Sequence, residues 1–351
     1  MSGDVLGVVV VTFNSGEVVL DCLESLLADR SVPMSVVVVD NASTDGTSDL
    51  VRDWAAGRRA WVCPPDIPFA LSASAKPVAL ADAAEGPTRL PAISLIGAGV
   101  NGGFAAGVNI GLAHLARDPA IGRFWVLNPD SLAAPGAARA FATFDVGPFS
   151  LMGGRITYID PPGRIQIDGG TIDRRTGVTG NLNLGRDIDE APVPGAGDMA
   201  FISGASMVAS RAFYDRVGPL REDYFLYYEE VDWALRRGDL PLAFCPDARV
   251  YHRAGTSIGS PTLERIASPF SLYFKHRARL RFVRRFLPAA RPTALAYTVA
   301  KAGQYALKGH GAEAWATMAG AFGLRAPASV RSRLGPAAAE RAFAPGSADR
   351  A

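Results

Sequence analysis

Four-residue runs of valine alternate with amphipathic segments in the first part of the chain. The runs lie at 8–11 and 36–39, and no polar residue interrupts either of them. Runs of this kind predict strands that are buried on both faces of a sheet. Apolar residues recur at helical spacing over 17–27, and a further helix is expected over 48–54. This strand–helix–strand–helix order predicts a parallel sheet with helices on both faces.

Polar clusters follow these predicted strands directly. Residues 12–15 follow the first strand, and residues 40–47 follow the second. Two more strands are expected at 93–96 and 124–127. Because ligands of open parallel sheets bind outside the carboxyl ends of the strands, we expect a binding site where these clusters lie.

The rest of the chain is less regular. Residues 62–92 are rich in Pro, Ala and Ser, and they predict an irregular insertion. Further elements are expected as hairpin pieces near 155–159 and 165–172, a strand over 201–210, a helix over 211–217, a helix in the second half of 224–237, and short strands at 243–245 and 249–251. The expected organisation is an α/β domain over 1–259, a basic helical region over 260–335 and a disordered tail over 336–351.

The composition narrows the class of protein. Hydrophobic residues make up 48% and charged residues 20% of the 351 residues, which argues against disorder. The net charge of +2 gives no indication of nucleic acid as a partner. Three cysteines without CxxC spacing fit a reducing compartment better than a disulfide framework. With no secretory signal and no apolar run long enough to cross a bilayer, we expect a cytosolic or peripheral protein.

Two aspartates at predicted strand ends are candidate ligand-binding residues. Asp40 follows a buried strand, and its carboxylate could accept hydrogen bonds from a nucleobase or a ribose hydroxyl. The alternative is that Asp40, Asn41 and Ser43 cap the next helix and hold a turn. Asp130 could bind Mg²⁺ or Mn²⁺ if a diphosphate supplied the other oxygen ligands. For Asp130 a turn or cap is again the alternative.

An acidic run, Glu229-Glu230-Val231-Asp232, follows five large aromatic or apolar residues at 224–228. Adjacent carboxylates and aromatic walls raise carboxyl pKa values, as a general base at neutral pH requires. An ordinary acidic first turn of a helix is the alternative.

His252 stands at the end of a predicted strand, where it could bind a metal or be a structural hydrogen-bond partner. The glycines between 97 and 111 fit neither the Walker spacing nor a GxGxxG pattern, which disfavours a nicotinamide dehydrogenase. The segment 204–206 is not a Gly-x-Ser-x-Gly elbow, which disfavours a serine hydrolase.

The order of these motifs is more specific than any one of them. The series is TFN at 12–14, VVVVDNASTDGT at 36–47, NGGFAAGVN at 101–109, LNPD at 127–130, GASM at 204–207, FLYYEEVD at 225–232 and PDARVYH at 246–252. Over roughly residues 7–257 it resembles family 2 inverting glycosyltransferases, specifically their bacterial rhamnosyltransferase-like branch.

The resemblance implies a GT-A fold, which is α/β with a Rossmann-like, mostly parallel central sheet, here with a C-terminal helical extension. It implies a nucleotide-sugar site formed by Thr12, Asn14, Asp40, Asn41, Asp45, Asn101, Phe104, Asn109 and Asn128. It also implies a Mg or Mn ion held by Asp130 and His252, although Asn128 replaces the first Asp of the DxD element found in many relatives.

The same resemblance assigns the catalytic base to the acidic run. Glu230 takes the place usually held by Asp, and Glu229 and Asp232 flank it. Glu230 would remove the proton of an acceptor hydroxyl, which attacks the anomeric carbon from the face opposite the leaving diphosphate. Because Glu is one methylene longer than Asp, a neighbouring carboxylate could be the base instead.

Residues 271–287 predict a basic amphipathic helix. Six of them are Lys or Arg and none is acidic. Such a helix suits an anionic membrane surface or a diphosphate-bearing lipid, and the alternative is a helix packed on the α/β domain with a solvated basic face. The resemblance favours membrane association.

The expected function is transfer of a sugar from a nucleotide-sugar to a hydroxyl of a glycan or polyprenyl-diphosphate-linked saccharide, in cell-surface polysaccharide synthesis. The donor expected from the branch is dTDP-rhamnose, and uridine-diphosphate sugars are the rival; acceptor, linkage and oligomeric state stay open. The expected location is cytoplasmic, peripheral on the inner face of the plasma membrane.

Two alternatives remain. A sugar-nucleotide nucleotidyltransferase would carry a basic, glycine-rich loop after the first strand, and residues 12–16 contain no basic residue. A non-catalytic, sugar-nucleotide-binding scaffold on a membrane complex would be favoured by loss of Asp130 and the acidic run, and both are present.

Overall fold

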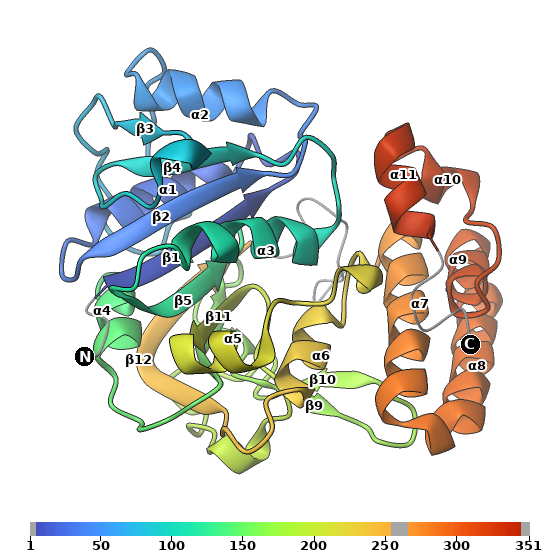
Figure 1. Ribbon diagram of the computed structural model, residues 1–351. Helices are drawn as coiled ribbons and strands as arrows, with labels where there is room; N and C mark the ends of the chain where they lie inside the picture. Colours follow the sequence, from blue (N-terminus) through green and yellow to red (C-terminus); the bar gives the residue numbers. More distant parts are fainter. Residues whose placement is uncertain (1–4, 254–265, 345–351) are drawn as a thin grey trace.

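The computed structural model describes residues 5–253 and 266–344. One large sheet runs through the first of these parts, with the strand order β3-β4-β2-β1-β5-β11-β7-β12-β6 and β8 beside β7. Its first five strands are all parallel (Figure 1). In sheet order, they are β3 (Leu80–Ala81), β4 (Ile93–Gly97), β2 (Met34–Asp40), β1 (Val5–Thr12) and β5 (Ile121–Leu127).

The second half of the sheet is mixed. Strand β11 pairs antiparallel with both β5 and β7, whereas β7 and β12 are parallel. The strands are β6 (Ser131–Ala133), β7 (Leu151–Tyr158), β8 (Ile165–Ile167), β11 (Ser206–Ser210) and β12 (Ala243–His252). A separate hairpin contains β9 (Gly170–Ile172) and β10 (Thr179–Asn181).

Helices cover both faces of the sheet, and alternate residues of β1 point into the two cores. Leu6, Val8 and Val10 pack with α1 (Val19–Ala28), α2 (Thr47–Ala55) and α4 (Ala137–Thr143). Val5, Val9 and Val11 pack with α3 (Phe104–Leu115), α5 (Arg211–Val217) and α6 (Glu229–Leu235). The predicted α/β fold with a mostly parallel central sheet is therefore confirmed.

Two glycines let α3 lie directly on β1. A Cβ atom at Gly107 would lie 2.5 Å from Val11, and one at Gly111 would lie 2.4 Å from Val9. These glycines allow close helix–strand packing, which is a structural requirement independent of any phosphate.

Several predicted elements differ in length. The insertion 62–92 is irregular apart from β3 and the 3-10 turn η1 (Ala83–Glu85). The strand expected over 201–210 is confined to β11, and the two short strands expected between 243 and 251 form one strand, β12, with an irregularity between Cys245 and Arg249. Two more 3-10 turns are η2 (Ala196–Asp198) and η3 (Glu222–Tyr224).

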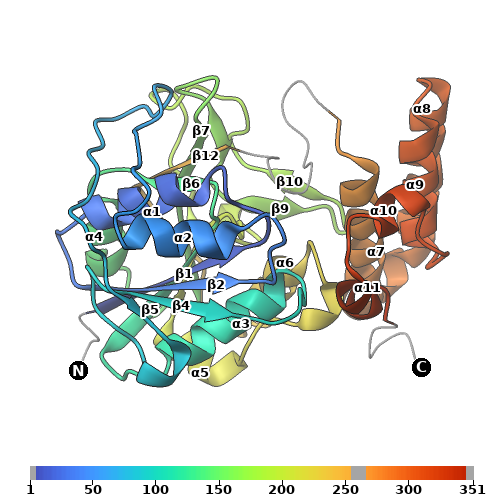
Figure 2. The same ribbon diagram turned by 90° about the horizontal axis from the view of Figure 1, so that it is seen from above.

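The C-terminal part forms a helical module beside the α/β domain (Figures 1 and 2). It contains α7 (Pro269–Phe286), the turn η4 (Pro288–Ala290), α8 (Arg291–Leu307), α9 (Gly311–Ala321), α10 (Ala328–Arg331) and α11 (Pro336–Phe343). Phe270 and Phe274 of α7 pack in a core with residues of α9, α10 and α11. Phe282 and Val283, farther along α7, pack in the core of the α/β domain. The helix α7 thus joins the two parts.

The disordered tail predicted from residue 336 is wrong for its first residues. They form α11, whose Ala338 and Ala342 are buried against the helical module. Alanine-rich sequence is compatible with close packing of this kind, because small side chains let helices approach. Residues 345–351 lie outside the described part of the chain.

For 271–287, the alternative of a helix packed on the α/β domain with a solvated basic face is wrong in its second part. Every residue of α7 is buried or half-buried, and Arg279 and Arg281 are only 2% and 4% exposed. Arg279 donates to the carbonyl oxygens of Thr176 and Ala294. The α/β domain and α8–α11 pack around α7, so its cations point into the molecule. Over the residues that the structure describes, no helix is long and apolar enough to span a membrane.

Candidate active site

A cavity of about 170 Å³ lies at the carboxyl ends of the parallel strands, as the topology of the sheet predicts. We call it the strand-end cavity. Six residues predicted from the sequence line it: Asn41, Asn101, Phe104, Asn128, Asp130 and His252. They come from the turns after β2, β4 and β5, from the start of α3 and from the end of β12.

The side chains of Asp130 and His252 are in contact with each other in the wall of this cavity. The imidazole Nε2 lies 3.1 Å from Asp130 Oδ1, and both side chains are about nine-tenths buried. Pairing of β12 with β6 places His252 opposite Ser131, next to Asp130 in the chain. The backbone N–H of Arg253 donates to the carbonyl oxygen of Asp130 at 3.0 Å, which fixes the turn.

The two side chains suit a divalent cation. His252 Nδ1 lies 2.8 Å from Gln166 Oε1, and Nε2 is directed at the Asp130 carboxylate. In the tautomer with the proton on Nδ1, this proton is donated to Gln166 and the Nε2 lone pair is available to a metal. Two ligands at right angles on an ion with ligand distances near 2.1 Å are about 3 Å apart, close to the observed separation. No group of three or more His, Cys, Asp or Glu residues in the described chain could hold a metal, so phosphate oxygens would have to complete the site.

Asn41 and Asn101 join two of the strand-end turns. Asn41 Nδ2 donates to Asn101 Oδ1 at 3.1 Å and to the carbonyl oxygen of Gly103 at 2.9 Å. The N–H of Gly102 donates to Asn41 Oδ1. These bonds hold the turn before α3 in place against the turn after β2.

Other predicted binding residues lie near the same edge but do not line the cavity. Thr12 Oγ1 donates to Asp40 Oδ1 at 3.0 Å, and Ser43 Oγ donates to the same oxygen at 2.5 Å. Asn14 accepts from the N–H of Thr44. This part of the prediction, a nucleoside site at Thr12, Asn14 and Asp40, stays a prediction.

Asp45 holds a turn. Its carboxylate accepts hydrogen bonds from Gly16 and Thr47. Burial alone would raise the pKa of Asp45, but these hydrogen bonds outweigh burial and lower the pKa below its ordinary value. This is the turn-forming role that the sequence left open for this cluster.

A strained aromatic loop leads into the acidic run. Phe225, Tyr227 and Tyr228 all have φ between 63° and 70°, which is costly for bulky residues. The Phe104 N–H donates to the Phe225 carbonyl oxygen at 2.9 Å. At Gly103, where φ is +90°, a Cβ atom would lie 2.1 Å from that same oxygen, so only glycine fits. The contact fixes this loop, and with it the start of α6.

Glu229 and Glu230 begin α6, where Glu229 is buried and Glu230 is half-buried. Burial raises the pKa of Glu230 to about 7, and the Lys275 ammonium on α7 acts in the opposite direction. Burial, and then the neighbouring Glu230 charge, raise the pKa of Glu229 well above its ordinary value. Glu229 Oε2 is buried without a hydrogen-bond partner among the described residues. A carboxyl group with a pKa near neutrality can accept a proton at physiological pH.

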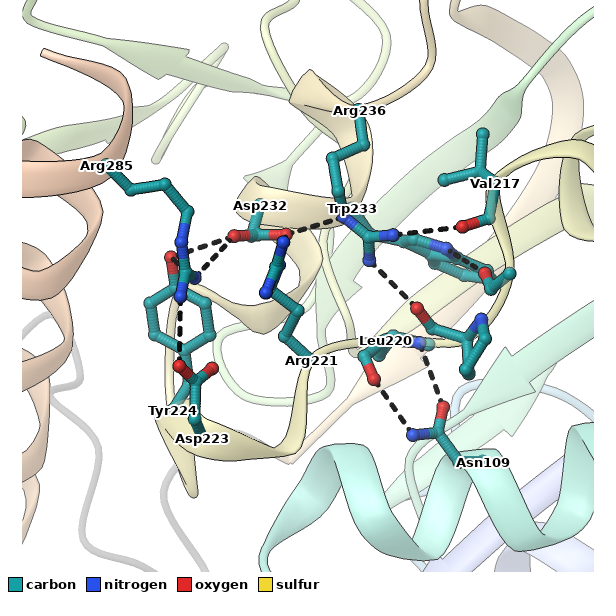
Figure 3. A network of polar contacts seen from close by, with 12 residues as sticks. Asn109, Val217, Leu220, Arg221, Asp223, Tyr224, Asp232, Trp233, Arg236 and Arg285 are labelled. Atoms are coloured by element: carbon teal, nitrogen blue, oxygen red, sulfur yellow. Dashed lines mark hydrogen bonds and ion pairs between the residues drawn. The ribbon is translucent and has the colours of Figure 1, made fainter. Parts of the chain in front are cut away.

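Asp232 has different surroundings from the two glutamates (Figure 3). It is fully buried and contacts the guanidinium groups of Arg236 at 2.7 Å and Arg285 at 2.9 Å, while the Tyr224 hydroxyl donates to it at 3.0 Å. Asp232 therefore joins α6 to α7, and a structural role accounts for all of these contacts.

Asn109 also points away from the cavity. Its side chain exchanges two hydrogen bonds, each of 2.9 Å, with the backbone of Leu220 (Figure 3). It also donates to Glu222. Asn109 thus fixes the segment that precedes the aromatic loop.

Five further residues complete the cavity. Phe225 and Leu226 come from the aromatic run singled out in the sequence, whereas Phe270, Arg333 and Leu334 come from the helical module and are not predicted from the sequence. The Arg333 guanidinium lies 4.8 Å from the centre of the Phe270 ring. The three residues of the helical module are remote in sequence from the strand-end motifs, so no local pattern could have associated them with the site.

Three comparisons with known proteins bear on the class of this site. Residues 7–63 match the model of the family described as glycosyl transferase family 2. Over 293 residues, covering 76% of this chain and 81% of the relative, the chain is 26% identical to "N-acetylglucosaminyl-diphospho-decaprenol L-rhamnosyltransferase" of Mycobacterium tuberculosis (strain CDC 1551 / Oshkosh).

Solved structures are similar at low sequence identity. One is the mannosyltransferase PcManGT from Pyrobaculum calidifontis in complex with GDP-Man and Mn²⁺, with a TM-score of 0.47, 16% identity, and coverage of 96% of this chain and 84% of that one. Another is GalNAc-T7 with UDP, GalNAc and Mn²⁺, with a TM-score of 0.48, 13% identity, and coverage of 80% and 47%.

The match of residues 7–63 to glycosyl transferase family 2 and the similarity to the mycobacterial relative support a glycosyltransferase of the rhamnosyltransferase-like kind. The mixed α/β domain with its mostly parallel sheet is compatible with this class.

Proposed function

We propose that this protein transfers rhamnose from dTDP-rhamnose, with inversion, to a hydroxyl of a polyprenyl-diphosphate-linked saccharide during cell-wall polysaccharide synthesis. Glycosyl transfer follows from the family; the sugar and the lipid-linked acceptor rest on the name of the mycobacterial relative. The observation that carries the proposal is the Asp130–His252 pair beside Asn41 and Asn101 in the strand-end cavity. Action on such an acceptor would place the protein in the cytoplasm, peripherally at the membrane.

Asp130 and His252 would hold a Mg or Mn ion, with Asn128 beside them. When bound, the ion would neutralise charge on the leaving nucleoside diphosphate. Gln166 keeps His252 in the tautomer that a ligand needs. Arg333 would add a positive charge on the side of the cavity formed by the helical module.

Glu230 would remove the proton from the acceptor hydroxyl. The hydroxyl oxygen forms the bond to the anomeric carbon as the bond from that carbon to the diphosphate oxygen breaks, and the proton goes to Glu230. Attack from the face opposite the diphosphate inverts the configuration. The hydrogen bonds from Phe104 to Phe225 and from Asn109 to Leu220 hold the segment that leads into α6 in position for this step.

Binding of the nucleotide should require a divalent metal ion, and binding of that ion should require Asp130. We expect dTDP with Mn²⁺ or Mg²⁺ to raise the melting temperature, since a ligand at 100 times its Kd adds about 2.7 kcal/mol of stability. Asp130→Asn should lose the metal-dependent part of this shift. The matched control is Asp118→Asn. Asp118 lies just beyond the C-terminal end of α3, so this variant should retain the metal-dependent shift.

The same measurement with EDTA, and with a panel of dTDP- and UDP-sugars, tests the metal and the donor. An unchanged shift in EDTA would contradict the metal assignment. A larger shift with a UDP-sugar than with dTDP-rhamnose would contradict the donor.

Arg333 should contribute to donor binding from the helical module. Arg333→Gln should weaken binding of the nucleoside diphosphate about 10- to 100-fold, because hydrogen bonds to charged groups contribute about 1.5–3 kcal/mol. Isothermal titration of dTDP with metal measures this. Arg59→Gln, which removes an exposed charge outside both the strand-end cavity and the helical module, should bind normally, and equal weakening by both variants would refute the role.

A further inference from the structure

The helical module contains a second and larger pocket, of about 660 Å³. It lies between α7, α8 and the segment 320–326, and it shares none of its described lining residues with the strand-end cavity. We call it the arginine pocket, because six arginines line it: Arg277, Arg281, Arg284, Arg291, Arg325 and Arg331. No acidic side chain is among its described lining residues.

Three of these arginines lie close together on α7. Arg277, Arg281 and Arg284 follow one another at spacings of four and three residues, so they share one side of the helix. Like charges at this spacing repel one another, and burial lowers the pKa of Arg277 and Arg281. Arg277 directs N–H groups at the carbonyl oxygens of Ala342 and Ala344. The Asp223 carboxylate, which is not among the described lining residues, favours the charged forms of Arg281 and Arg284 and, against the effect of burial, acts to raise their pKa. An anion bound in the pocket would interact favourably with the same cations.

The geometry of the guanidinium group indicates which anion. Its planar fork of N–H donors matches the oxygens of a phosphate in a bidentate arrangement. Several such groups around one space suit a phosphate or diphosphate better than a single carboxylate, because the charge of the anion is then also matched.

The remaining walls of the pocket are apolar. Leu280, Val283 and Leu295 line it, as do Phe322 and Leu324. Phe322 and Leu324 are 46% and 44% exposed, respectively, so apolar surface continues from the pocket toward solvent. A ligand that matches both kinds of wall carries an anionic head and an apolar chain.

We propose that the arginine pocket binds the phosphate or diphosphate head of an apolar-chain lipid, at a site separate from the strand-end cavity. The binding itself does not depend on the transfer reaction. That the lipid belongs to the acceptor rests on the proposed function.

Isothermal titration of the full chain in EDTA tests this, with farnesyl diphosphate, inorganic diphosphate and farnesol as probes. EDTA suppresses metal-dependent binding at the strand-end cavity. Farnesyl diphosphate should bind, inorganic diphosphate should bind more weakly, and farnesol should not bind.

Two double variants locate the binding. R325Q/R331Q removes two exposed arginines of the pocket and should weaken binding of farnesyl diphosphate tenfold or more, which corresponds to about 1.4 kcal/mol or more. R52Q/R59Q removes two exposed arginines near α2 and should bind as the unaltered chain does. F322S/L324S should weaken binding of farnesyl diphosphate and leave that of inorganic diphosphate unchanged.

Three results would overturn the proposal. They are absence of binding, equal affinity for inorganic and farnesyl diphosphate, and unchanged binding in R325Q/R331Q. A chain that binds farnesyl diphosphate as expected but transfers no sugar supports the pocket and counts against the proposed function only.

Discussion

Glu230→Gln should reduce turnover by about 10²- to 10⁴-fold while the chain still binds its donor, because the variant cannot accept the proton of the acceptor hydroxyl. Glutamine has nearly the same shape as glutamate, so the fold should be preserved. Single-turnover measurements with saturating donor and acceptor isolate this step from binding. Glu229→Gln is the matched control and should retain most of the turnover. The reverse result, with Glu229→Gln inactive and Glu230→Gln active, would move the base to Glu229.

The pH dependence gives an independent test of the same role. The pKa of Glu230 is raised to about 7, so the residue is a protonated acid below that pH and a base above it. Turnover should therefore rise with pH through about 7 and then level off. Because the Lys275 ammonium lowers the pKa of Glu230, Lys275→Met should move the midpoint to higher pH. A profile that is flat between pH 6 and 8 would contradict the assignment.

Asp232→Ala should destabilise the fold by about 3–5 kcal/mol, because it leaves the buried Arg236 and Arg285 contacts without their carboxylate. This is a large part of the stability of an ordinary domain. Denaturant unfolding followed by tryptophan fluorescence measures the change. Asp215→Ala is the control, because Asp215 is exposed and its ion pair with Arg211 should contribute about 0.5 kcal/mol or less.

Asp232→Asn separates the structural role from a catalytic one. The amide oxygen can still accept hydrogen bonds from the arginines, so this variant should be more stable than Asp232→Ala. At a temperature where the variant is fully folded, its turnover should be close to normal. A variant that is stable but inactive would assign Asp232 to the chemistry after all.

The sequence predicts the sheet well because buried parallel strands need uninterrupted apolar residues on both faces. The valine runs of β1 and β2 meet this need and are recognisable without any partner strand. The position of the site could be predicted from the topology of the sheet. Asn41, Asn101 and Asp130 line one cavity because parallel strands place their carboxyl ends at a common edge.

A motif in the sequence does not reveal the direction in which each of its side chains points. Asp232 is two residues beyond Glu230 in a helix, so the two side chains point about 200° apart around the axis. One of them can face a substrate only if the other faces the core, and the arginines around Asp232 show that it is the one in the core. Asn109 lies about a turn and a half beyond Phe104 in α3, so the two side chains are on different sides of that helix. Phe104 lines the cavity, whereas Asn109 points to Leu220.

The basic segment 271–287 shows another limit of sequence patterns. Periodicity reveals that Arg277, Arg281 and Arg284 share a side of the helix, but it does not reveal what lies opposite that side. Here α8–α11 supply further packing, and Arg285 reaches Asp232 in the α/β domain. The contribution of Arg333 to the strand-end cavity could not be predicted either, because a contact across about two hundred residues leaves no local trace.

The wall of the strand-end cavity begins at Val11 and ends at Leu334. During synthesis, the strands that hold Asn41 and Asp130 leave the ribosome long before the helix that precedes Arg333. A nascent chain can therefore build its sheet while one side of the cavity is still missing. Donor binding at full strength becomes possible only after the segment with Arg333 and Leu334 has been made and has packed, so the fold itself sets the earliest time at which the protein can begin to consume activated sugar.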